Sequence, residues 1–274
     1  MSKEKNRTTP DLNNFKAGGF IKERGKDLFT VRLKVPGGRL TIPRLRKIAA
    51  VAEKYGGEFV HLSVRQSIEL VNINFTDFDA VTAELAEGDQ RVASCGARVR
   101  APTACGGCEY NPNSLVDTQK SAMEVDGRFT GRETGHHKFK VGIAGCPFDC
   151  PKSGTNDVGF QGAIWPKLHA EACSCCGLCI TSCAEGAVTA GSDGRPVFIP
   201  WKCACCGDCV KICPTGAWQA EKTGYSVRIG GKWGRHPLVG TLFATFLPED
   251  RAADFVAAVL DWYREKAGGT GSLA

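Results

Sequence analysis

Residues 173–188 read CSCCGLCITSCAEGAV, and residues 203–218 repeat them as CACCGDCVKICPTGAW. Each copy places four cysteines in the spacing CxxCxxCxxxC, which is typical of bacterial ferredoxin runs that hold two [4Fe–4S] clusters. In such pairs of runs the fourth cysteine of each run binds the cluster of the other. The repeat, with a period of 30 residues, therefore predicts a two-cluster electron-transfer module inside a longer chain.

The spacing also assigns each cysteine to a cluster. A short turn with exposed amides brings three thiolates onto one face of a cubane, and amide hydrogen bonds offset the negative charge. A pair of zinc knuckles is the alternative, but two complete runs at this spacing favour clusters. Cys175 and Cys205 exceed the ligand count and are interpreted as small turn residues. The two predicted ligand sets are Cys173, Cys176, Cys179 with Cys213, and Cys203, Cys206, Cys209 with Cys183.

Composition sets the context for these cysteines. The chain has 274 residues, 42% of them hydrophobic, which allows one large domain or two modest ones. Its N-terminal stretch, MSKEKNRTTPDLNN, has no apolar signal-peptide core, and no segment approaches the length of a membrane span. We therefore expect a cytoplasmic chain whose 15 cysteines serve as ligands or redox groups instead of disulfides.

The positive charge is clustered. The net charge is +6, and cations gather at residues 32–46, 98–100, 138–140 and 228–236. Aromatic residues make up only 8% and do not alternate with these cations, so nucleic-acid binding is not indicated. Separate basic clusters are better explained by a buried anionic cofactor or an anionic substrate.

The order of predicted elements indicates an α+β protein with an insertion. The final helix, over 248–266, is expected to face the core with Phe255, Val259, Trp262 and Tyr263. A strand at 139–144 leads straight into Cys146, a common setting for a functional site. In the first 90 residues we expect strands at 28–35, 58–64 and 68–73 and helices at 41–55 and 78–85. The predicted divisions are 1–90, 91–165, the insertion 166–216, and 217–274 with a strand at 225–229.

Five cysteines lie outside the module, and two of them stand in KVGIAGCPFDCPKSGTNDVGFQG at 140–162. This segment resembles the cluster-binding signature of the sirohaem-dependent sulfite and nitrite reductases. Four further stretches resemble the same family in the same order, so the likeness covers nearly the whole chain. They are TVRLKVPGGR at 30–39, SVRQSIEL at 63–70, HKFK at 137–140 and IGGKWGRHP at 229–237.

The resemblance implies a ferredoxin-like half-domain, a sirohaem and [4Fe–4S]-binding α/β domain, and the inserted ferredoxin module. It implies a third [4Fe–4S] cluster that shares the sulfur of Cys150 with the sirohaem iron, with Cys146 as a second ligand. The family's other two ligands form a CxxxxxC pair, whereas here Asn111 stands six positions after Cys105. We assign Cys105 and Cys108, which form CxxC, as the remaining ligands. A redox dithiol at CxxC would leave Cys146 and Cys150 without partners, and Cys95 is interpreted as a small buried residue.

The resemblance also gives the basic clusters a role. Sirohaem carries carboxylates around its rim, and sulfite and nitrite are anions, so cations must line the cofactor pocket and its distal face. The residues matching the family's substrate-binding and proton-delivering cations are Arg32 or Lys34, Arg65, Lys138 and Lys140. The residues expected to meet the cofactor carboxylates are Arg98, Arg100, Lys232, Arg235 and His236.

The implied activity is the six-electron reduction of sulfite to sulfide, with electrons passing from the two module clusters through the third cluster and the Cys150 sulfur to the sirohaem. Reduction of nitrite to ammonia remains open, and so does a non-catalytic electron-transfer subunit. No predicted strand is followed by the GxGxxG of a dinucleotide site. A partner, either a ferredoxin or an NADH-oxidising subunit, is therefore expected to donate the electrons.

Overall fold

The computed structural model describes residues 11–135, 137–266 and 273, so most of the N-terminal stretch MSKEKNRTTPDLNN lies outside this part. The chain divides into two compact units, one of residues 1–101 with 130–138 and one of residues 102–129 with 139–274. Helices and strands are mixed in both units, as the α+β prediction requires. Within the described residues, no helix combines the length and apolar character needed to cross a membrane.

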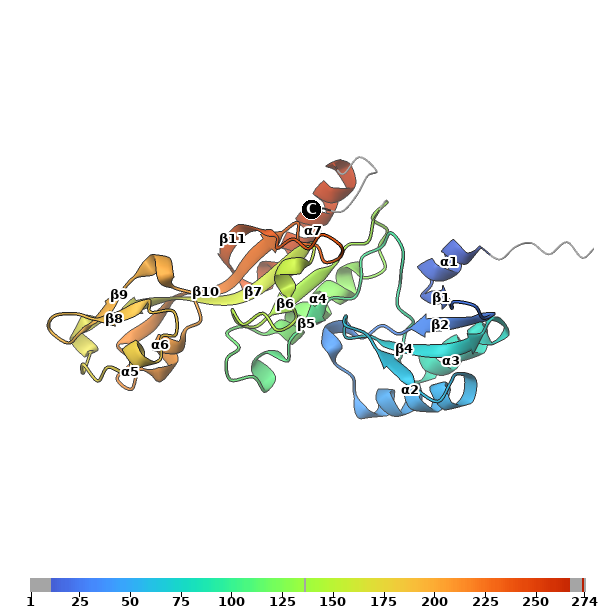
Figure 1. The fold of residues 1–274 in the computed structure, drawn as a ribbon, viewed down its shortest axis with the longest axis horizontal. Coiled ribbons are helices and arrows are strands. Elements are labelled where there is room, and N and C mark those ends of the chain that lie inside the picture. The colour runs from blue at the N-terminus through green and yellow to red at the C-terminus, as the bar shows by residue number, and fades with distance from the viewer. Residues whose placement is uncertain (1–10, 136, 267–272, 274) are drawn as a thin grey trace, which may run out of the picture. The chain divides into compact units, whose positions relative to one another are not determined.

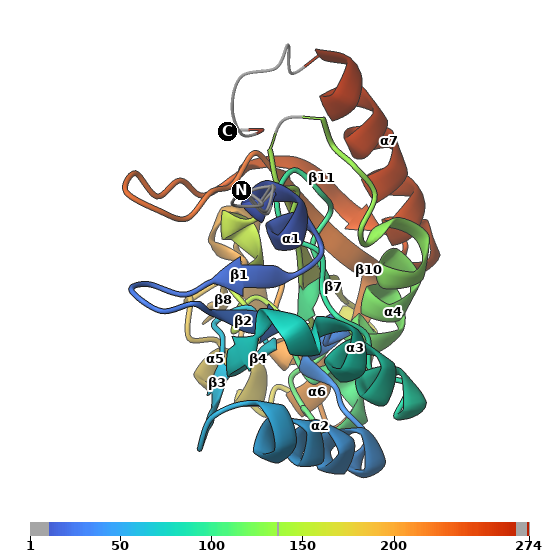
Figure 2. The same ribbon diagram turned by 90° about the vertical axis from the view of Figure 1, so that its right-hand side faces the viewer.

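The first unit is built on an antiparallel sheet with the strand order β1-β2-β4-β3. Helices α2 and α3 lie side by side against this sheet (Figure 2). The predicted strands and helices are present, and β1 and α1 are additional elements that the sequence did not indicate. Their bounds are α1 Leu12–Ala17, β1 Phe20–Lys22, β2 Leu28–Arg32, α2 Ile42–Tyr55, β3 Val60–Leu62, β4 Ile68–Asn74 and α3 Phe78–Glu87.

Helix α2 shows how local sequence sets an element. The Thr41 hydroxyl accepts a hydrogen bond from the Arg44 N–H at 3.4 Å, and Gly56 ends the helix after Tyr55. Between these ends, Ile48, Val51 and Ala52 are buried on one face. The predicted start and end of this helix are confirmed.

Replacing Ile48 by valine is expected to lower the free energy of unfolding by about 1 kcal/mol, because Ile48 is only 1% exposed. The matched control is Ile42→Val in the same helix, where the side chain is 59% exposed and the change should be close to zero. Anaerobic urea denaturation of both variants measures the difference. Equal losses would contradict the assignment of the buried face.

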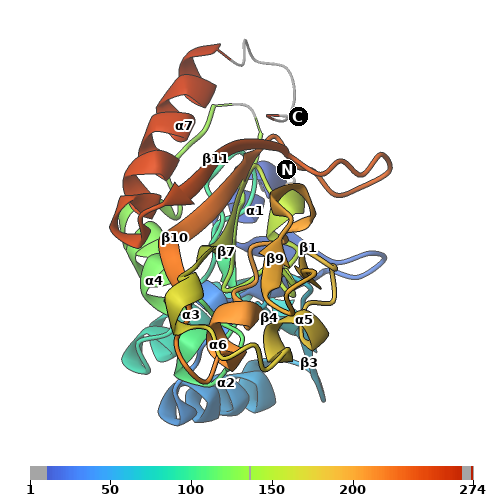
Figure 3. The ribbon, with the colours of Figure 1, turned by 90° about the vertical axis from the view of Figure 1, so that its left-hand side faces the viewer.

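The second unit contains a five-stranded sheet among its described residues, in the order β11-β10-β7-β6-β5. Strands β5, β6 and β7 are parallel to one another, and α4 and α7 lie side by side along the sheet (Figure 3). The large buried side chains between these layers include Phe139, Phe160, Tyr225 and Tyr263. The elements are β5 Thr103–Ala104, α4 Thr118–Phe129, β6 Val141–Ala144, β7 Val158–Leu168, β10 Trp218–Ile229, β11 Thr241–Leu247 and α7 Ala252–Lys266.

One expectation for α7 is wrong. Trp262 was predicted to face the core but is 54% exposed, whereas Val259 and Tyr263 are buried. The buried stripe includes Val256 and Leu260 at helical spacing, and Trp262 falls beside it.

The cysteine-rich module lies between the ends of β7 and β10, which pair antiparallel out to Leu168 opposite Trp218. Figure 1 shows it at the end of this two-stranded ribbon. Val188 and Trp218 form its small core with Cys179 and Cys209. The module contains α5 Leu178–Thr181, β8 Val188–Ala190, β9 Pro196–Phe198 and α6 Asp208–Ile212. The module also contains two single 3-10 turns, Ala170–Ala172 and Pro200–Lys202. The 3-10 turns in the rest of the described residues are Pro36–Gly38, Phe75–Asp77, Gly107–Glu109, Ser153–Thr155 and Glu249–Arg251.

Candidate metal and cofactor site

Two of the predicted ligands follow neighbouring strands of the second unit. Cys105 comes directly after β5 and Cys146 two residues after β6, and these strands pair in parallel. Carboxyl ends of parallel strands meet at one sheet edge, so the two cysteines come together there. The Gly145 N–H donates to the Cys105 sulfur at 3.1 Å, which ties the two loops to each other.

The segment after β6 turns twice to present Cys150. The Asp149 N–H donates to the Cys146 carbonyl at 3.2 Å, and the Lys152 N–H donates to the Asp149 carbonyl at 2.8 Å. The Asp149 carboxylate accepts the N–H groups of Ser153 and Gly154 at 2.7 and 3.2 Å. Asp149 has a left-handed backbone with φ of 48°, which Asp tolerates better than most residues. As a result Cys150 is exposed while Cys146 is buried.

The electrostatics place three of the thiols in one neighbourhood. Burial raises the pKa of the Cys146 thiol, a hydrogen bond from the Phe148 N–H partly offsets this rise, and Cys105 and Cys150 raise the pKa further. Cys108, on the turn Gly107–Glu109, is exposed. Burial and the nearby carboxylate of Asp117 raise its pKa. The structure thus brings Cys105, Cys146 and Cys150 together and places Cys108 beside acidic groups.

The module cysteines surround two separate pockets, and each pocket collects the set that the repeat predicts. In each set the four cysteines line one pocket. Among the described residues, no group of three or more His, Cys, Asp or Glu side chains is placed to hold a single metal ion. A cubane binds its four thiolates at separate corners, so this arrangement fits a [4Fe–4S] cluster. One pocket is lined by Cys173, Cys176, Cys179 and Cys213, and the other by Cys183, Cys203, Cys206 and Cys209.

Backbone N–H groups already point at the module sulfurs. Cys175 and Cys205 are left-handed turn residues, with φ of 55° and 59°, as their interpretation as turn positions requires. Their N–H groups donate to the sulfurs of Cys173 and Cys203 at 3.4 and 3.3 Å. The Ala187 N–H donates to the Cys183 sulfur at 3.2 Å. Such donors stabilise the negative charge of a thiolate-bound cluster.

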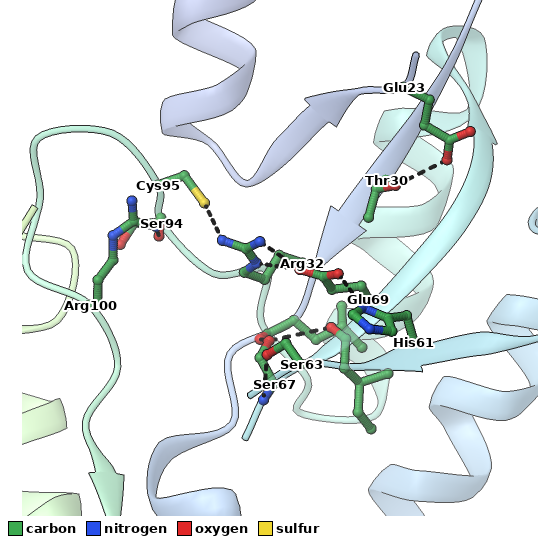
Figure 4. Close-up of polar contacts among 12 residues, drawn as sticks. Glu23, Thr30, Arg32, His61, Ser63, Ser67, Glu69, Ser94, Cys95 and Arg100 are labelled. Carbon is green, nitrogen blue, oxygen red and sulfur yellow. Dashed lines mark hydrogen bonds and ion pairs between the residues drawn. The ribbon is translucent and has the colours of Figure 1, made fainter. Parts of the chain in front are cut away.

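The cations of the first unit are partly engaged by neighbours, as Figure 4 shows around Arg32. The Arg32 guanidinium donates to Glu69 at 2.7 Å and to the Cys95 sulfur at 3.3 Å. His61 Nδ1 lies 2.7 Å from the other Glu69 oxygen. Burial alone would raise the pKa of Glu69, but the hydrogen bonds from His61 and Arg32 outweigh it and hold the pKa below its ordinary 4.5. Cys95 is buried, as predicted.

The other predicted cations of this unit lie on loops and strand ends. Lys34 lies two residues after Arg32 and, like it, is half-buried, between the buried Leu33 and Val35. Three arginines contact their own unit: Arg65 donates to the Ala101 carbonyl at 2.9 Å, Arg98 pairs with Glu133 at 3.0 Å, and Arg100 donates to the Ser94 carbonyl at 2.9 Å (Figure 4). Lys138 is exposed.

In the second unit a basic loop packs against the segment that follows Cys150. A Cβ added at Gly231 would lie 2.3 Å from the Gly154 carbonyl oxygen, so only glycine allows this approach. The Lys152 ammonium lies 5.7 Å from the centre of the exposed Trp233 ring. Lys232, Arg235 and His236 belong to this loop, whose ends are closed by mutual backbone hydrogen bonds between Lys232 and Leu238. The exposed Cys150 thiol precedes the segment that this basic loop packs against, and such a setting fits an anionic macrocycle that carries a metal.

Carboxylates that were not predicted from the sequence contact Lys140 and other residues of this site. The buried Asp157 accepts the Lys140 N–H at 2.9 Å, and the Lys140 ammonium lies 3.8 Å from the same oxygen. The hydrogen bonds that the Asp149 and Glu69 carboxylates accept were likewise not predicted from the sequence. A signal existed for Glu69, which interrupts the buried run Ile68 to Leu70 with a charge. A charge at such a position predicts a partner of opposite charge.

The fold and the site together define an iron–sulfur protein with a ferredoxin-like half-domain and an inserted ferredoxin module. Residues 95–271 match the nitrite and sulphite reductase 4Fe-4S domain, and residues 21–88 match the nitrite/sulfite reductase ferredoxin-like half domain. The chain therefore belongs to the nitrite and sulfite reductase family, as the resemblance of its motifs predicted.

Relatives support this assignment over most of the chain. The chain is 35% identical over 251 residues to the coenzyme F420-dependent sulfite reductase of Methanocaldococcus jannaschii, covering 91% of this chain and 40% of that protein. It is 30% identical over 264 residues to a subunit of the anaerobic sulfite reductase of Salmonella typhimurium, covering 90% and 77%. Identity to the chloroplastic ferredoxin–nitrite reductase of Zea mays is 28% over 147 residues, covering 53% and 26%. The chain thus spans less than half the length of the first and third relatives.

Solved structures confirm the predicted fold. Dissimilatory sulfite reductase I superimposes with a TM-score of 0.73 at 20% identity, covering 90% of this chain and 65% of that one. The NirA protein of Mycobacterium tuberculosis superimposes with a TM-score of 0.65 at 17% identity, covering 93% and 40%. At these identities the likeness concerns the fold.

Proposed function

We propose that this chain is the catalytic chain of a sulfite reductase that reduces sulfite to sulfide with six electrons and six protons. The observation that carries the proposal is the loop cluster of the second unit, where Cys105 and Cys146 follow adjacent parallel strands and Cys150 is exposed beside the basic loop. Two relatives with sulfite reductase names, at 35% and 30% identity, support sulfite as the substrate.

Four metal groups follow from the ligand sets. One [4Fe–4S] cluster is assigned to Cys105, Cys108, Cys146 and Cys150, and two more to the pockets of the module. Sirohaem, when bound, supplies a redox-active iron in a macrocycle with a carboxylate rim. The Cys150 sulfur is the proposed link to it, and the proposed carboxylate partners are Arg98, Arg100, Lys232, Arg235 and His236. Thiols in this number persist in a reducing compartment, so we place the chain in the cytoplasm.

The substrate is an oxyanion, and fixed cations bind it and stabilise charge that develops on oxygen. We assign this role to Arg32 or Lys34, Arg65, Lys138 and Lys140. Glu69 orients Arg32 through their 2.7 Å hydrogen bond, and Asp157 lies 3.8 Å from the Lys140 ammonium. These carboxylates lower the net positive charge, so the cations bind and release a small anion without trapping it.

Electrons are proposed to come from a partner protein, either a ferredoxin or an NADH-oxidising subunit. The Salmonella relative is named as a subunit, which supports assembly into a complex. The second candidate function is reduction of nitrite to ammonia, which the nitrite reductase of Zea mays favours.

The test begins with anaerobic purification after sirohaem-supplemented expression. We expect a sirohaem absorption band on top of the broad cluster absorption, and sulfide production from sulfite with reduced methyl viologen. A higher kcat/KM for nitrite than for sulfite would favour the second function. Absence of the sirohaem band, with about twelve irons or fewer per chain all accounted for by clusters, would refute a reductase and leave an electron-transfer subunit.

A further inference from the structure

The two halves of the module repeat are alike in sequence but differ in their surroundings. Gly177 and Gly207 hold equivalent positions and nearly identical backbones, with φ of 75° and 74°. A Cβ at Gly177 would meet no atom of the described residues within 4 Å. A Cβ at Gly207 would lie 3.1 Å from Ile164 and 3.5 Å from Leu115. One half of the module therefore packs on the rest of the second unit at a point where its twin is open.

The packed half is tied to the loops that carry Cys105 and Cys146. The Ile164 N–H on β7 donates to the Cys205 carbonyl at 2.9 Å. The Leu115 N–H donates to the Gly145 carbonyl at 2.8 Å, and the Gly145 N–H donates to the Cys105 sulfur. A short chain of contacts thus joins the second cysteine run to the cluster loops.

Pro147 and Phe148 make the most direct link. Both residues line the pocket that contains Cys183, Cys203, Cys206 and Cys209. The Phe148 N–H also donates to the sulfur of Cys146. The wall of the second pocket therefore begins at Pro147, the residue directly after the predicted ligand Cys146. The pocket with Cys173 and Cys213 is lined by module residues from Cys173 to Trp218.

We propose that the four cysteines of this Phe148-lined pocket hold an inner relay cluster, which exchanges electrons directly with the cluster at Cys146. The set of Cys173, Cys176, Cys179 and Cys213 then holds an outer cluster, where the partner's electrons arrive. Each step moves one electron and no atoms. The outer cluster is oxidised as the inner one is reduced, and the inner cluster is oxidised as the cluster at Cys146 is reduced. The proposal rests on the proposed function, which supplies the three clusters.

Matched substitutions in the two cysteine runs test this order. Cys176→Ala removes a ligand of the outer cluster and Cys206→Ala the equivalent ligand of the inner one. Both variants of the full chain are reduced with dithionite and examined by electron paramagnetic resonance, in which neighbouring reduced clusters split each other's signals. We expect Cys176→Ala to keep the splitting between the inner cluster and the cluster at Cys146, and Cys206→Ala to lose it. The reverse pattern, or equal splitting in both, would overturn the proposal.

A second variant keeps every thiolate in place. Phe148 lines the inner pocket although it is 70% exposed. Phe148→Ala therefore opens this wall of the pocket further to water, which stabilises the more negative reduced state of a cluster. We expect an upward shift in the midpoint potential of the inner cluster in a redox titration followed by the same resonance signals, and an unchanged potential of the outer cluster. A midpoint potential that shifts only for the outer cluster, or for neither cluster, would contradict the proposed order of inner and outer clusters. A wild-type chain with iron for fewer than three clusters would instead refute the proposed function.

Discussion

Replacing Cys146 by alanine is expected to remove one complete cluster and all sulfite reduction. Cys146 is only 5% exposed and shares its neighbourhood with Cys105 and Cys150. A cluster that loses a buried thiolate has no replacement ligand at that corner. Cluster iron per chain, which is the total less the one sirohaem iron, should fall from about twelve to about eight, because the module clusters bind elsewhere. Iron analysis and a methyl viologen assay of the anaerobically purified variant measure both effects.

Cys175→Ala is the matched control, since Cys175 is exposed, is not one of the predicted ligands, and keeps its backbone N–H toward the Cys173 sulfur in the variant. It should retain all of the iron. Cys108→Ala, measured in the same way, tests the assignment of the fourth ligand and should lose as much iron as the Cys146 variant. Full iron content in Cys146→Ala would rule out a cluster at this sheet edge.

Replacing Glu69 by glutamine is expected to lower the free energy of unfolding by about 3 kcal/mol at neutral pH. Glu69 is 8% exposed and is the shared partner of Arg32 and His61. Glutamine keeps the size of the side chain but leaves the Arg32 guanidinium without its counter-charge. Arg32 also loses its fixed orientation, so the KM for sulfite should rise. Urea denaturation of the full chain measures the first effect and steady-state kinetics the second.

Wild type and Glu69→Gln should differ in free energy of unfolding by an amount that depends on pH. The reason is the pKa of Glu69, which lies below its ordinary 4.5 in the folded protein. The unfolded chain then binds the proton more readily, so the stabilisation by Glu69 is complete above about pH 4.5. It is lost as the pH falls through the lower folded pKa. The difference in free energy of unfolding between wild type and Glu69→Gln should therefore become smaller as the pH is lowered. Glu53→Gln, on the exposed side of α2, is the control, and its free energy of unfolding at neutral pH should stay close to that of the wild type.

The gathering of the module cysteines around two pockets could be predicted from the sequence because the constraint is local. Three cysteines within seven residues must lie on one short turn, and the repeat supplies the fourth from the other run. The same locality explains why α2 was predicted over residues 41–55. Helix α4 has no comparable signal, since its segment TQKSAMEVDGRF carries a glycine and mixed polarity, and its burial depends on strands distant in sequence.

The partners of the cations could not be predicted for a related reason. Arg32 and Glu69 are 37 residues apart and meet because β2 and β4 pair in register at these two positions. Lys140 and Asp157 meet because β6 and β7 run side by side. The family likeness points to the cations but not to the carboxylates that hold them. Such pairs follow from strand register, which a single sequence specifies weakly for short strands.

The pairing of Leu168 with Trp218 makes the ferredoxin module an insert at the tip of a hairpin. Hairpin tips accept inserted segments readily, because the strands on either side keep their pairing whatever follows. The electron supply can therefore be exchanged as one segment, provided that the new module presents a surface complementary to Ile164, Leu115 and Phe148. Evolution of a new electron donor, or its design, then needs changes in this inserted segment alone, while the part proposed to reduce sulfite stays as it is.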